Sequence, residues 1–252
     1  MKVVRTIGEL ETAPGTGLVP TMGAFHDGHR ALFRAARAEN RRVVASLYVN
    51  PAQFNEAADL EMYPCDEARD FEIAESEGVD VVFAPGELYP EGFATWVVPE
   101  ATGAEGAARA GHFRGVATVC LKLFNIVRPD RAYFGQKDAQ QVAVIRRLVR
   151  DLNVPVEIRV VPTVRDADGL ALSSRNARLS PAERERALGL QRALASAIHN
   201  ADPVAAARAS LNGLEPDYVE VVDLGDARLL AAAIRVGATR LIDNVLLEGE
   251  IR

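Results

Sequence analysis

Short apolar runs of strand length alternate along the chain with longer segments of helical spacing. The runs are rich in valine and other residues that favour strands. They cover residues 17–19, 42–49, 79–84, 93–98, 131–134 and 156–161. The helical segments cover residues 31–38, 113–127 and about 138–152. Because strands separated by helices pair in parallel, the pattern predicts an α/β fold, a doubly wound parallel sheet with helices on both faces.

The connections between these elements are less regular. Residues 55–63 are predicted to form a polar loop, and Pro64 is expected to open a charged helix that ends at Gly78. The Ala- and Gly-rich stretch after residue 98, up to Gly111, is predicted to be a mobile loop.

A change of composition near Arg175 marks a second part of the chain. Ser180 and Glu183 have the spacing of a capping box, with Pro181 at the first helical position, so a helix is expected to about residue 198. A second helix is predicted over residues 203–212, and strands over 218–223, 229–236 and 239–247. We therefore expect one domain over residues 1–175 and a smaller C-terminal α+β domain, helices plus an antiparallel sheet, over 176–252.

The first strand-to-helix connection is the strongest candidate for chemistry. Gly23 and Gly28 allow a close backbone approach or a positive φ, and a helix N-terminus offers unpaired N–H groups to an anion. If the helix begins near Asp27, His26 and His29 lie on one face of it. The pattern indicates a phosphate site, although an ordinary turn with polar histidines would have the same sequence pattern.

Two further polar segments could bind phosphate oxygens. Lys137 follows a strand, and Asp138 and Gln141 lie one turn apart in the helix after it, where parallel sheets collect ligands. Ser173 to Asn176 bring two hydroxyls and a guanidinium together. Taken singly, each segment also has a plainer interpretation, a solvated surface lysine and an ordinary polar loop.

Composition narrows the class of protein. The net charge is −6 and the sequence pI about 5.4, so neither nucleic acid nor an anionic membrane is an expected partner. Cys65 and Cys120 are too few for a disulfide scaffold, and both are expected to be small buried or half-buried residues. No apolar run has the length of a signal peptide core or membrane span, which predicts a cytoplasmic protein. No cluster of carboxylates predicts a metal held by the protein.

Several motifs in a fixed order resemble the pantothenate synthetases, a family of ATP-dependent pantoate and β-alanine ligases. They are Pro20-Thr21-Met22-Gly23 with His26 and His29; Val49-Asn50-Pro51-Ala52-Gln53-Phe54; His112-Phe113-Arg114-Gly115-Val116 with Phe134-Gly135-Gln136-Lys137-Asp138; Ser173-Ser174-Arg175-Asn176; and Thr239-Arg240-Leu241-Ile242-Asp243-Asn244. Their order extends over nearly the whole chain. The resemblance implies a Rossmann-like N-terminal domain with an HxGH-type signature, a C-terminal lid domain, a homodimer, and ATP with Mg²⁺.

The resemblance also implies roles for individual residues. His29 matches the catalytic acid, and His26 and Lys137 match catalytic groups on the phosphates. The residues that match ATP contacts are Met22, Gly23, Ala24, Phe25, His26, Asp27, Gly28, His29, Gly135, Gln136, Lys137, Asp138, Val164, Leu172, Ser173, Ser174 and Arg175. Substrate contacts match Gln53, Gln141, Arg109 and His112. The implied reaction is condensation of (R)-pantoate with β-alanine to pantothenate through a pantoyl adenylate, with release of AMP and pyrophosphate.

Some positions depart from the family pattern, and other functions fit parts of the sequence. Gln136, Ala139, Leu172 and Ala110 stand where the family commonly has Glu, an aromatic residue, Met and Pro. A nucleotidyltransferase that keeps the nucleotide in its product is the nearest alternative, and a non-catalytic nucleotide-binding module is another. An aminoacyl-tRNA synthetase is a further alternative because it shares the HxGH-type signature, but this acidic chain has no room for an anticodon domain.

Overall fold

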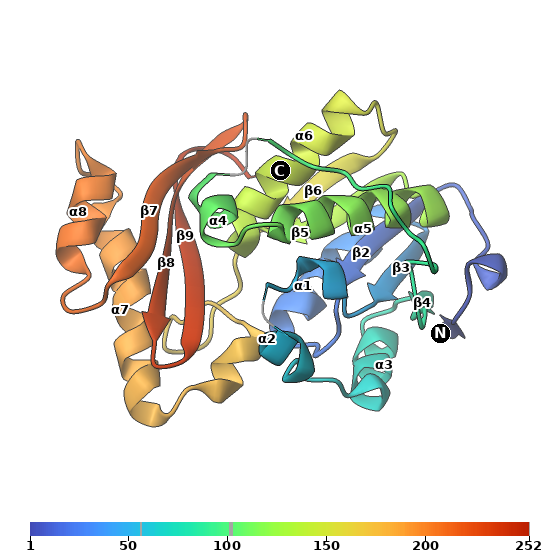
Figure 1. Cartoon of the computed structure of the whole chain (residues 1–252), viewed down its shortest axis with the longest axis horizontal. Helices are drawn as coiled ribbons and strands as arrows, with labels where there is room; N and C mark the ends of the chain where they lie inside the picture. Colours follow the sequence, from blue (N-terminus) through green and yellow to red (C-terminus); the bar gives the residue numbers. More distant parts are fainter. Residues whose placement is uncertain (56, 101–102, 252) are drawn as a thin grey trace.

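A computed structural model describes residues 1–55, 57–100 and 103–251 and contains two sheets (Figure 1). The larger has six parallel strands in the order β1-β4-β3-β2-β5-β6. Its strands are β1 (Lys2–Val4), β2 (Thr16–Thr21), β3 (Arg42–Leu47), β4 (Val81–Phe83), β5 (Arg131–Gly135) and β6 (Glu157–Val161). The predicted doubly wound parallel sheet is confirmed, and β1 is an edge strand that the sequence pattern did not reveal.

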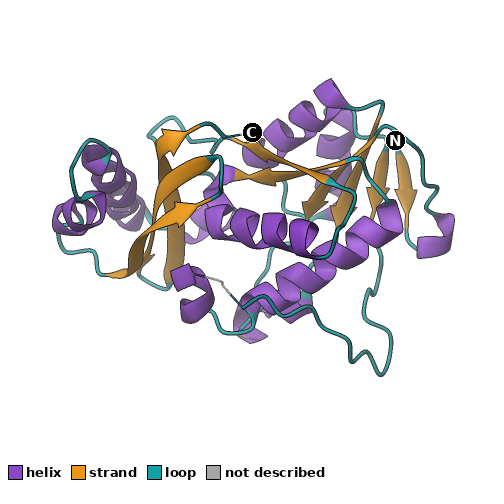
Figure 2. Ribbon diagram, turned by 90° about the horizontal axis from the view of Figure 1, so that it is seen from above, coloured by secondary structure: helices purple, strands orange, loops and turns teal. Residues whose placement is uncertain are grey.

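Helices cover both faces of the parallel sheet because its strands alternate in the direction of their apolar side chains. In β2, Leu18 packs with α5 (His112–Val127) and α6 (Ala139–Asp151). Its neighbour Val19 packs with α1 (Asp27–Glu39) and α3 (Glu67–Ser76) on the opposite face. Figure 2 shows the strands between these helices. Among the described residues, no helix has both the length and the apolar character needed to cross a membrane.

The second sheet is antiparallel and lies in the C-terminal part of the chain. It consists of β7 (Pro216–Asp223), β8 (Ala227–Val236) and β9 (Thr239–Gly249), as the sequence predicted. The helices beside it are α7 (Pro181–Ala197), which begins with the predicted capping box, and α8 (Pro203–Ser210).

The two sheets share apolar packing. In β8, Leu230 and Ile234 pack in a cluster with α7 and α8, whereas Leu229 and Ala233 belong to the cluster that also contains α5 and α6. The C-terminal sheet is therefore packed against the parallel-sheet core through one of its faces. The domain boundary at Arg175 stays a prediction.

The strand predicted over residues 93–98 is wrong, because these residues form a loop. Phe93 and Trp96 pack edge to face, with ring centroids 5.1 Å apart, and the Arg114 guanidinium lies 4.5 Å from the Trp96 ring centroid. Val97 donates its N–H to Thr118 Oγ1 of α5 at 3.0 Å. The apolar and aromatic character that favoured a strand thus serves packing against a helix.

Three predictions for the connections are also corrected. Residues 55–63 contain α2 (Ala57–Glu61), and α3 begins after Asp66, whose side chain caps it, rather than at Pro64. The stretch predicted as a mobile loop contains α4 (Gly103–Ala108). Residues 56, 101 and 102 of these predicted loops lie outside the described residues. Cys120 is buried as expected, but Cys65 is exposed.

The strand order fixes where a ligand would bind. From β2 the chain adds β3 and β4 on one side, and then returns to add β5 and β6 on the other. The neighbours β2 and β5 are therefore the point at which the strand order reverses, and open α/β sheets bind ligands beyond the carboxyl ends of such strands. Both predicted strand-to-helix connections leave the sheet at this point.

Candidate active site

A cavity of about 250 Å³ opens beyond the carboxyl ends of β2 and β5. It brings together most of the residues that the sequence singled out. Those that line it are Met22, His26, Gly28, His29, Gln53, Arg109, His112, Gly135, Lys137, Asp138, Gln141, Val164, Leu172, Ser173, Ser174 and Arg175. These residues come from six separate segments of the chain, so the fold gathers them into one candidate site.

Five predicted site residues do not line this cavity. Phe25 and Gln136 are buried, the Asp27 side chain is 77 % exposed, and Gly23 and Ala24 complete the set. Phe25 packs on the rings of His29 and Phe33. Phe25 thus supports a residue of the cavity wall, and the contact of all five residues with a nucleotide stays a prediction.

His26 and His29 are held by backbone N–H groups at the start of α1. His26 is the N-cap residue, and its Nδ1 accepts from the N–H of Gly28 at 3.1 Å. The Nδ1 of His29 accepts from the N–H of His26 at 3.2 Å. Because a neutral imidazole has one acceptor and one donor nitrogen, both rings carry their proton on Nε2. The ring centroids lie 4.2 Å apart, so two N–H donors belong to one patch of the cavity wall.

Burial keeps both imidazoles neutral near pH 7. It lowers the pKa of His29 to about 3, with further lowering by the neighbouring His26 and Lys137. It lowers the pKa of His26 to about 4, again with Lys137 contributing. Both rings can therefore donate hydrogen bonds to an anion without adding charge of their own.

Local geometry explains the glycine of this motif and reveals a supporting residue. A Cβ at Gly28 would lie 2.8 Å from Cε1 of the His26 ring, so only glycine lets that ring fold back onto the backbone. The preceding turn is fixed by Asp70, whose carboxylate accepts from the N–H groups of Ala24 at 2.8 Å and Phe25 at 2.7 Å. Sequence reasoning missed Asp70. A carboxylate one turn before Ile73 and Ala74, on the buried face of α3, was the available signal.

Lys137 stands in a 3₁₀ turn between β5 and α6. Its ammonium lies 3.6 Å from the Asp138 carboxylate, and its side chain is 20 % exposed. Asn244 of β9 donates to the carbonyl groups of Gln136 at 2.8 Å and Lys137 at 3.0 Å. The C-terminal sheet thus fixes the turn that carries Lys137. We refer to His26, His29 and Lys137 as the switch-point group.

Gln53, Arg109 and His112 form a second set, which we call the arginine group. His112 donates from Nδ1 to the backbone carbonyl of Gln53 at 2.8 Å and accepts at Nε2 from Arg109 at 3.0 Å. Burial lowers the pKa of His112 to about 4, and the positive charge of Arg109 lowers it further. The neutral ring therefore links a guanidinium to the segment that carries Gln53.

Asn50 orients the Gln53 side chain, and sequence reasoning gave it no role. Its amide group donates to Gln53 Oε1 at 2.9 Å, and its own oxygen accepts from the Tyr89 hydroxyl at 2.8 Å. The residue is buried at the end of β3, directly before Pro51. A polar residue at the carboxyl end of a buried strand was the signal that could have found it.

The segment Ser173 to Arg178 is tied to α2. Arg175 and Arg178 donate to the Asp59 carboxylate at 2.8 and 3.1 Å. Ser173 caps its own turn by accepting from the N–H of Arg175 at 3.3 Å. These contacts hold a guanidinium and two hydroxyls at the cavity wall.

The chemistry of the wall suits anions but offers no activated nucleophile. Lys137, Arg109 and Arg175 carry positive charge, and Asp138 is the carboxylate that lines this cavity among the described residues. Cys120 also lines it, but burial raises the pKa of its thiol to about 12. A protonated thiol is a poor nucleophile, so the wall is built for hydrogen bonding and charge stabilisation.

A metal ion would find few protein ligands here. In residues 1–55, 57–100 and 103–251, no three or more His, Cys, Asp or Glu side chains gather in an arrangement that could hold one.

The chain is similar to known proteins over nearly its whole length. The pantoate-beta-alanine ligase family profile matches residues 2–246. The chain is 52 % identical over 277 positions to the pantothenate synthetase of Roseiflexus sp. (strain RS-1), with 98 % of this chain and 100 % of that relative covered. The crystal structure of pantothenate synthetase from Thermus thermophilus has a TM-score of 0.92 at 45 % identity, covering 98 % of this chain and 99 % of that one.

A pantoate-beta-alanine ligase from Francisella tularensis, crystallised in complex with beta-gamma ATP and beta-alanine, is similar as well. Its TM-score is 0.84 at 36 % identity, and 99 % of each chain is covered. The match of the family profile, the full-length identity and the shared fold point the same way. This chain belongs to the pantoate-beta-alanine ligase family.

Proposed function

We propose that this chain joins the carboxylate of (R)-pantoate to the amino group of β-alanine while converting ATP to AMP and pyrophosphate. Membership of the ligase family supports the overall reaction. The observation that carries the site assignment is the pair of neutral imidazoles beside Lys137 in the cavity at the reversal of strand order. Two N–H donors and one ammonium in one wall are what a polyphosphate requires.

In the first step, a carboxylate oxygen of pantoate attacks the α-phosphorus of ATP. A carbon-bound oxygen forms the new bond to phosphorus, the bond to pyrophosphate breaks, and pantoyl adenylate results. The Nε2–H groups of His26 and His29 and the Lys137 ammonium donate to the oxygens on which negative charge grows. Since His29 is neutral at pH 7, its role is hydrogen-bond donation.

In the second step, the amine of β-alanine attacks the acyl carbon of the adenylate. A C–N bond forms, the bond from the acyl carbon to the AMP oxygen breaks, and the amine nitrogen loses a proton to solvent water. Gln53 and Gln141 line the cavity and would orient pantoate through their amide groups, with Arg109 and His112 beside them. Neither step needs a covalent enzyme intermediate, which agrees with the protonated Cys120.

The remaining wall would hold the nucleotide. Asp138 is assigned to the ribose and the hydroxyls of Ser173 and Ser174 with Arg175 to phosphate oxygens, supported by their place at the wall. Gly135, Val164 and Leu172 would pack around the nucleoside. Mg²⁺ would enter as part of the substrate, bound to the ATP phosphates.

We further propose that the chain acts in the cytoplasm as a homodimer. The proposed use of ATP, a cytoplasmic metabolite, supports the cytoplasmic location. The dimer is supported by the family resemblance alone, and sedimentation of the purified chain tests it.

The test of the reaction is product formation with ATP, Mg²⁺ and pantoate, with and without β-alanine, while pyrophosphate is followed separately. Pantothenate and AMP should appear only when both substrates are present. A nucleotide retained in the product would favour the transferase alternative. Binding of ATP with no turnover would favour a non-catalytic module and contradict the proposal.

A further inference from the structure

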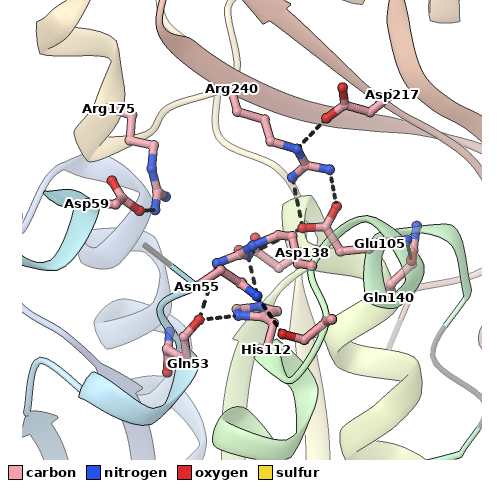
Figure 3. A network of polar contacts seen from close by, with 12 residues as sticks. Gln53, Asn55, Asp59, Glu105, His112, Asp138, Gln140, Arg175, Asp217 and Arg240 are labelled. Atoms are coloured by element: carbon pink, nitrogen blue, oxygen red, sulfur yellow. Dashed lines mark hydrogen bonds and ion pairs between the residues drawn. The ribbon is translucent and has the colours of Figure 1, made fainter. Parts of the chain in front are cut away.

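A chain of polar contacts links the C-terminal sheet to the arginine group. It begins on β7 with Asp217, passes through Arg240 of β9 to Glu105 of α4, and continues to Arg109. Figure 3 shows Arg240 between Asp217 and Glu105, and His112 beside Gln53. The function proposed above assigns no role to Glu105 or Arg240.

Glu105 is the centre of this chain. Its side chain is only 6 % exposed, and it accepts from both Nη atoms of Arg240, at 2.9 and 2.7 Å. It also accepts from Arg109 Nη1 at 3.3 Å. Burial raises the pKa of its carboxyl, but the hydrogen bonds and charge of Arg240 outweigh burial and lower it below its ordinary value. Glu105 is therefore an anion clamped between two guanidinium groups.

The same guanidinium of Arg109 also contacts the residues that face substrate. Its Nη1 donates to His112 Nε2 at 3.0 Å, and its Nη2 donates to the Gln53 carbonyl at 3.4 Å. Because the guanidinium is planar and rigid, fixing it at Glu105 also fixes the direction of these donors. A shift of Glu105 would move the whole arginine group.

The position of α4 is itself set by distant parts of the chain. The N–H of Ala104 donates to the Glu220 carboxylate of β7 at 3.1 Å, and the N–H of Glu105 donates to Gln140 Oε1 of α6 at 2.6 Å. A helix of six residues is too short to be stable alone, so these contacts and Arg240 determine where it lies.

We propose that Glu105 and Arg240 are positioning residues, through which the C-terminal sheet holds Arg109, His112 and Gln53 in the geometry that receives pantoate. The assignment of pantoate to this group rests on the proposed function. This series of polar contacts predicts a selective effect. Loss of Glu105 or Arg240 weakens the binding of pantoate and leaves the nucleotide contacts of Lys137 and Ser173 in place.

The test compares Glu105→Gln and Arg240→Gln with Arg240→Lys, using the full chain and steady-state kinetics for each substrate. Because these variants disturb the groups proposed to bind pantoate, kcat/KM for pantoate should fall by about 10- to 100-fold in the two Gln variants, chiefly through KM. The KM for ATP should stay within about twofold of the unsubstituted chain. Arg240→Lys keeps a cation at Glu105 and should recover part of the loss.

The matched control is Glu77→Gln. The Glu77 side chain is 7 % exposed and accepts from Arg30 and Arg34 at 2.6 to 2.7 Å, so it is also a buried carboxylate between two arginines. Unlike Arg109, neither of these arginines lines the cavity. This variant should lose a comparable amount of thermal stability while its KM for pantoate stays unchanged. It therefore separates positioning from a general loss of stability.

A double variant of Glu105 and Arg240 adds a second readout. If the two residues act in series, its loss in kcat/KM for pantoate should be no larger than that of Glu105→Gln alone. The inference is overturned if folded variants keep the pantoate parameters, or if the ATP and pantoate parameters worsen equally. Failure of the unsubstituted chain to form pantothenate would instead overturn the proposed function, and the inference with it.

Discussion

The two groups that face the cavity are held in different ways. In the switch-point group, the histidine rings are fixed by N–H groups of their own turn, at 3.1 and 3.2 Å. In the arginine group, the side chains are fixed by an ion-pair chain that reaches β9, since Glu105 binds Arg240 from 135 positions further along the sequence. The two histidines of the switch-point group depend on local backbone geometry, and the arginine group depends on the packing of two sheets.

This difference teaches which perturbations each group should tolerate. Backbone N–H donors cannot be removed by a side-chain substitution, so the switch-point histidines keep their tautomer unless the turn itself changes. The arginine group depends on buried charges, and removing one partner of a buried pair leaves the other uncompensated. The two histidines should fail only through their own turn or through Asp70, which fixes it. The arginine group can fail through distant residues, and so can Lys137, whose turn is held by Asn244 of β9.

The largest effect is expected for His29→Ala. It removes an N–H donor to the developing charge, and turnover should fall by about 10²- to 10³-fold, as for loss of one oxyanion donor. Lys137→Ala should lower turnover by a similar factor. Single-turnover measurement of adenylate formation checks both, with ATP affinity and circular dichroism as controls. Turnover that stays unchanged in a folded His29→Ala variant would contradict its role in the switch-point group.

One histidine in each group should make the free energy of unfolding depend on pH. His29 and His112 have pKa values of about 3 and about 4 in the folded chain, below the 6.5 of an unperturbed imidazole. The unfolded state therefore binds more protons between these values, so the stabilisation is present above pH 6.5 and is lost as pH falls. Between about pH 7 and pH 5 the free energy of unfolding should drop by about 1–2 kcal/mol per histidine.

Urea unfolding across this pH range measures that slope. His29→Gln and His112→Gln should each flatten it, because each removes one group that must be neutral in the folded state. His199→Gln is the matched control, since His199 is exposed and does not line the cavity. Equal slopes in all three variants would mean that burial of these rings has no energetic consequence.

A smaller effect is expected for Gln53→Ala. Gln53 is oriented by Asn50 through a 2.9 Å hydrogen bond, and its loss should raise the KM for pantoate by about tenfold, the value of one or two hydrogen bonds. ATP binding, measured by calorimetry, should change little because the switch-point group remains. An equal loss of affinity for ATP and pantoate would break the separation between the two groups.

The difference between local and long-range contacts also explains how much of the fold and of the site the sequence predicts. The switch-point group was predictable because His26 and His29 lie in one contiguous motif. The alternation of strands with helices makes the sheet parallel, and it therefore places Lys137 at the same edge of the sheet. The parallel sheet and the antiparallel C-terminal sheet follow from apolar patterning in the same way. In these elements, local pattern and final structure agree.

Glu105 and Arg240, which together support Arg109, were not predictable. Glu105 lies in an Ala- and Gly-rich stretch whose composition indicates a loop, and α4 forms there because β7, β9 and α6 supply its partners. Nothing in the local sequence pairs Glu105 with Arg240. The prediction of a strand over residues 93–98 fails for a related reason. Strand propensity largely measures packing against neighbouring side chains, and here a helix provides the packing surface.

Arg175 sharpens the comparison, because it is a proposed phosphate ligand held by an ion pair rather than by the backbone. Its partner Asp59 is partly exposed, at 26 % of the side chain, so the pair contributes about 0.2–1 kcal/mol. If ATP phosphates take Arg175 from Asp59, Asp59→Asn should lower the KM for ATP by up to about fivefold. Glu67→Gln, which breaks the exposed pair with Arg5 away from the cavity wall, should leave it unchanged. A higher KM for ATP in Asp59→Asn would show that Asp59 orients Arg175 instead, and would place this part of the nucleotide site with the ion-pair-dependent group.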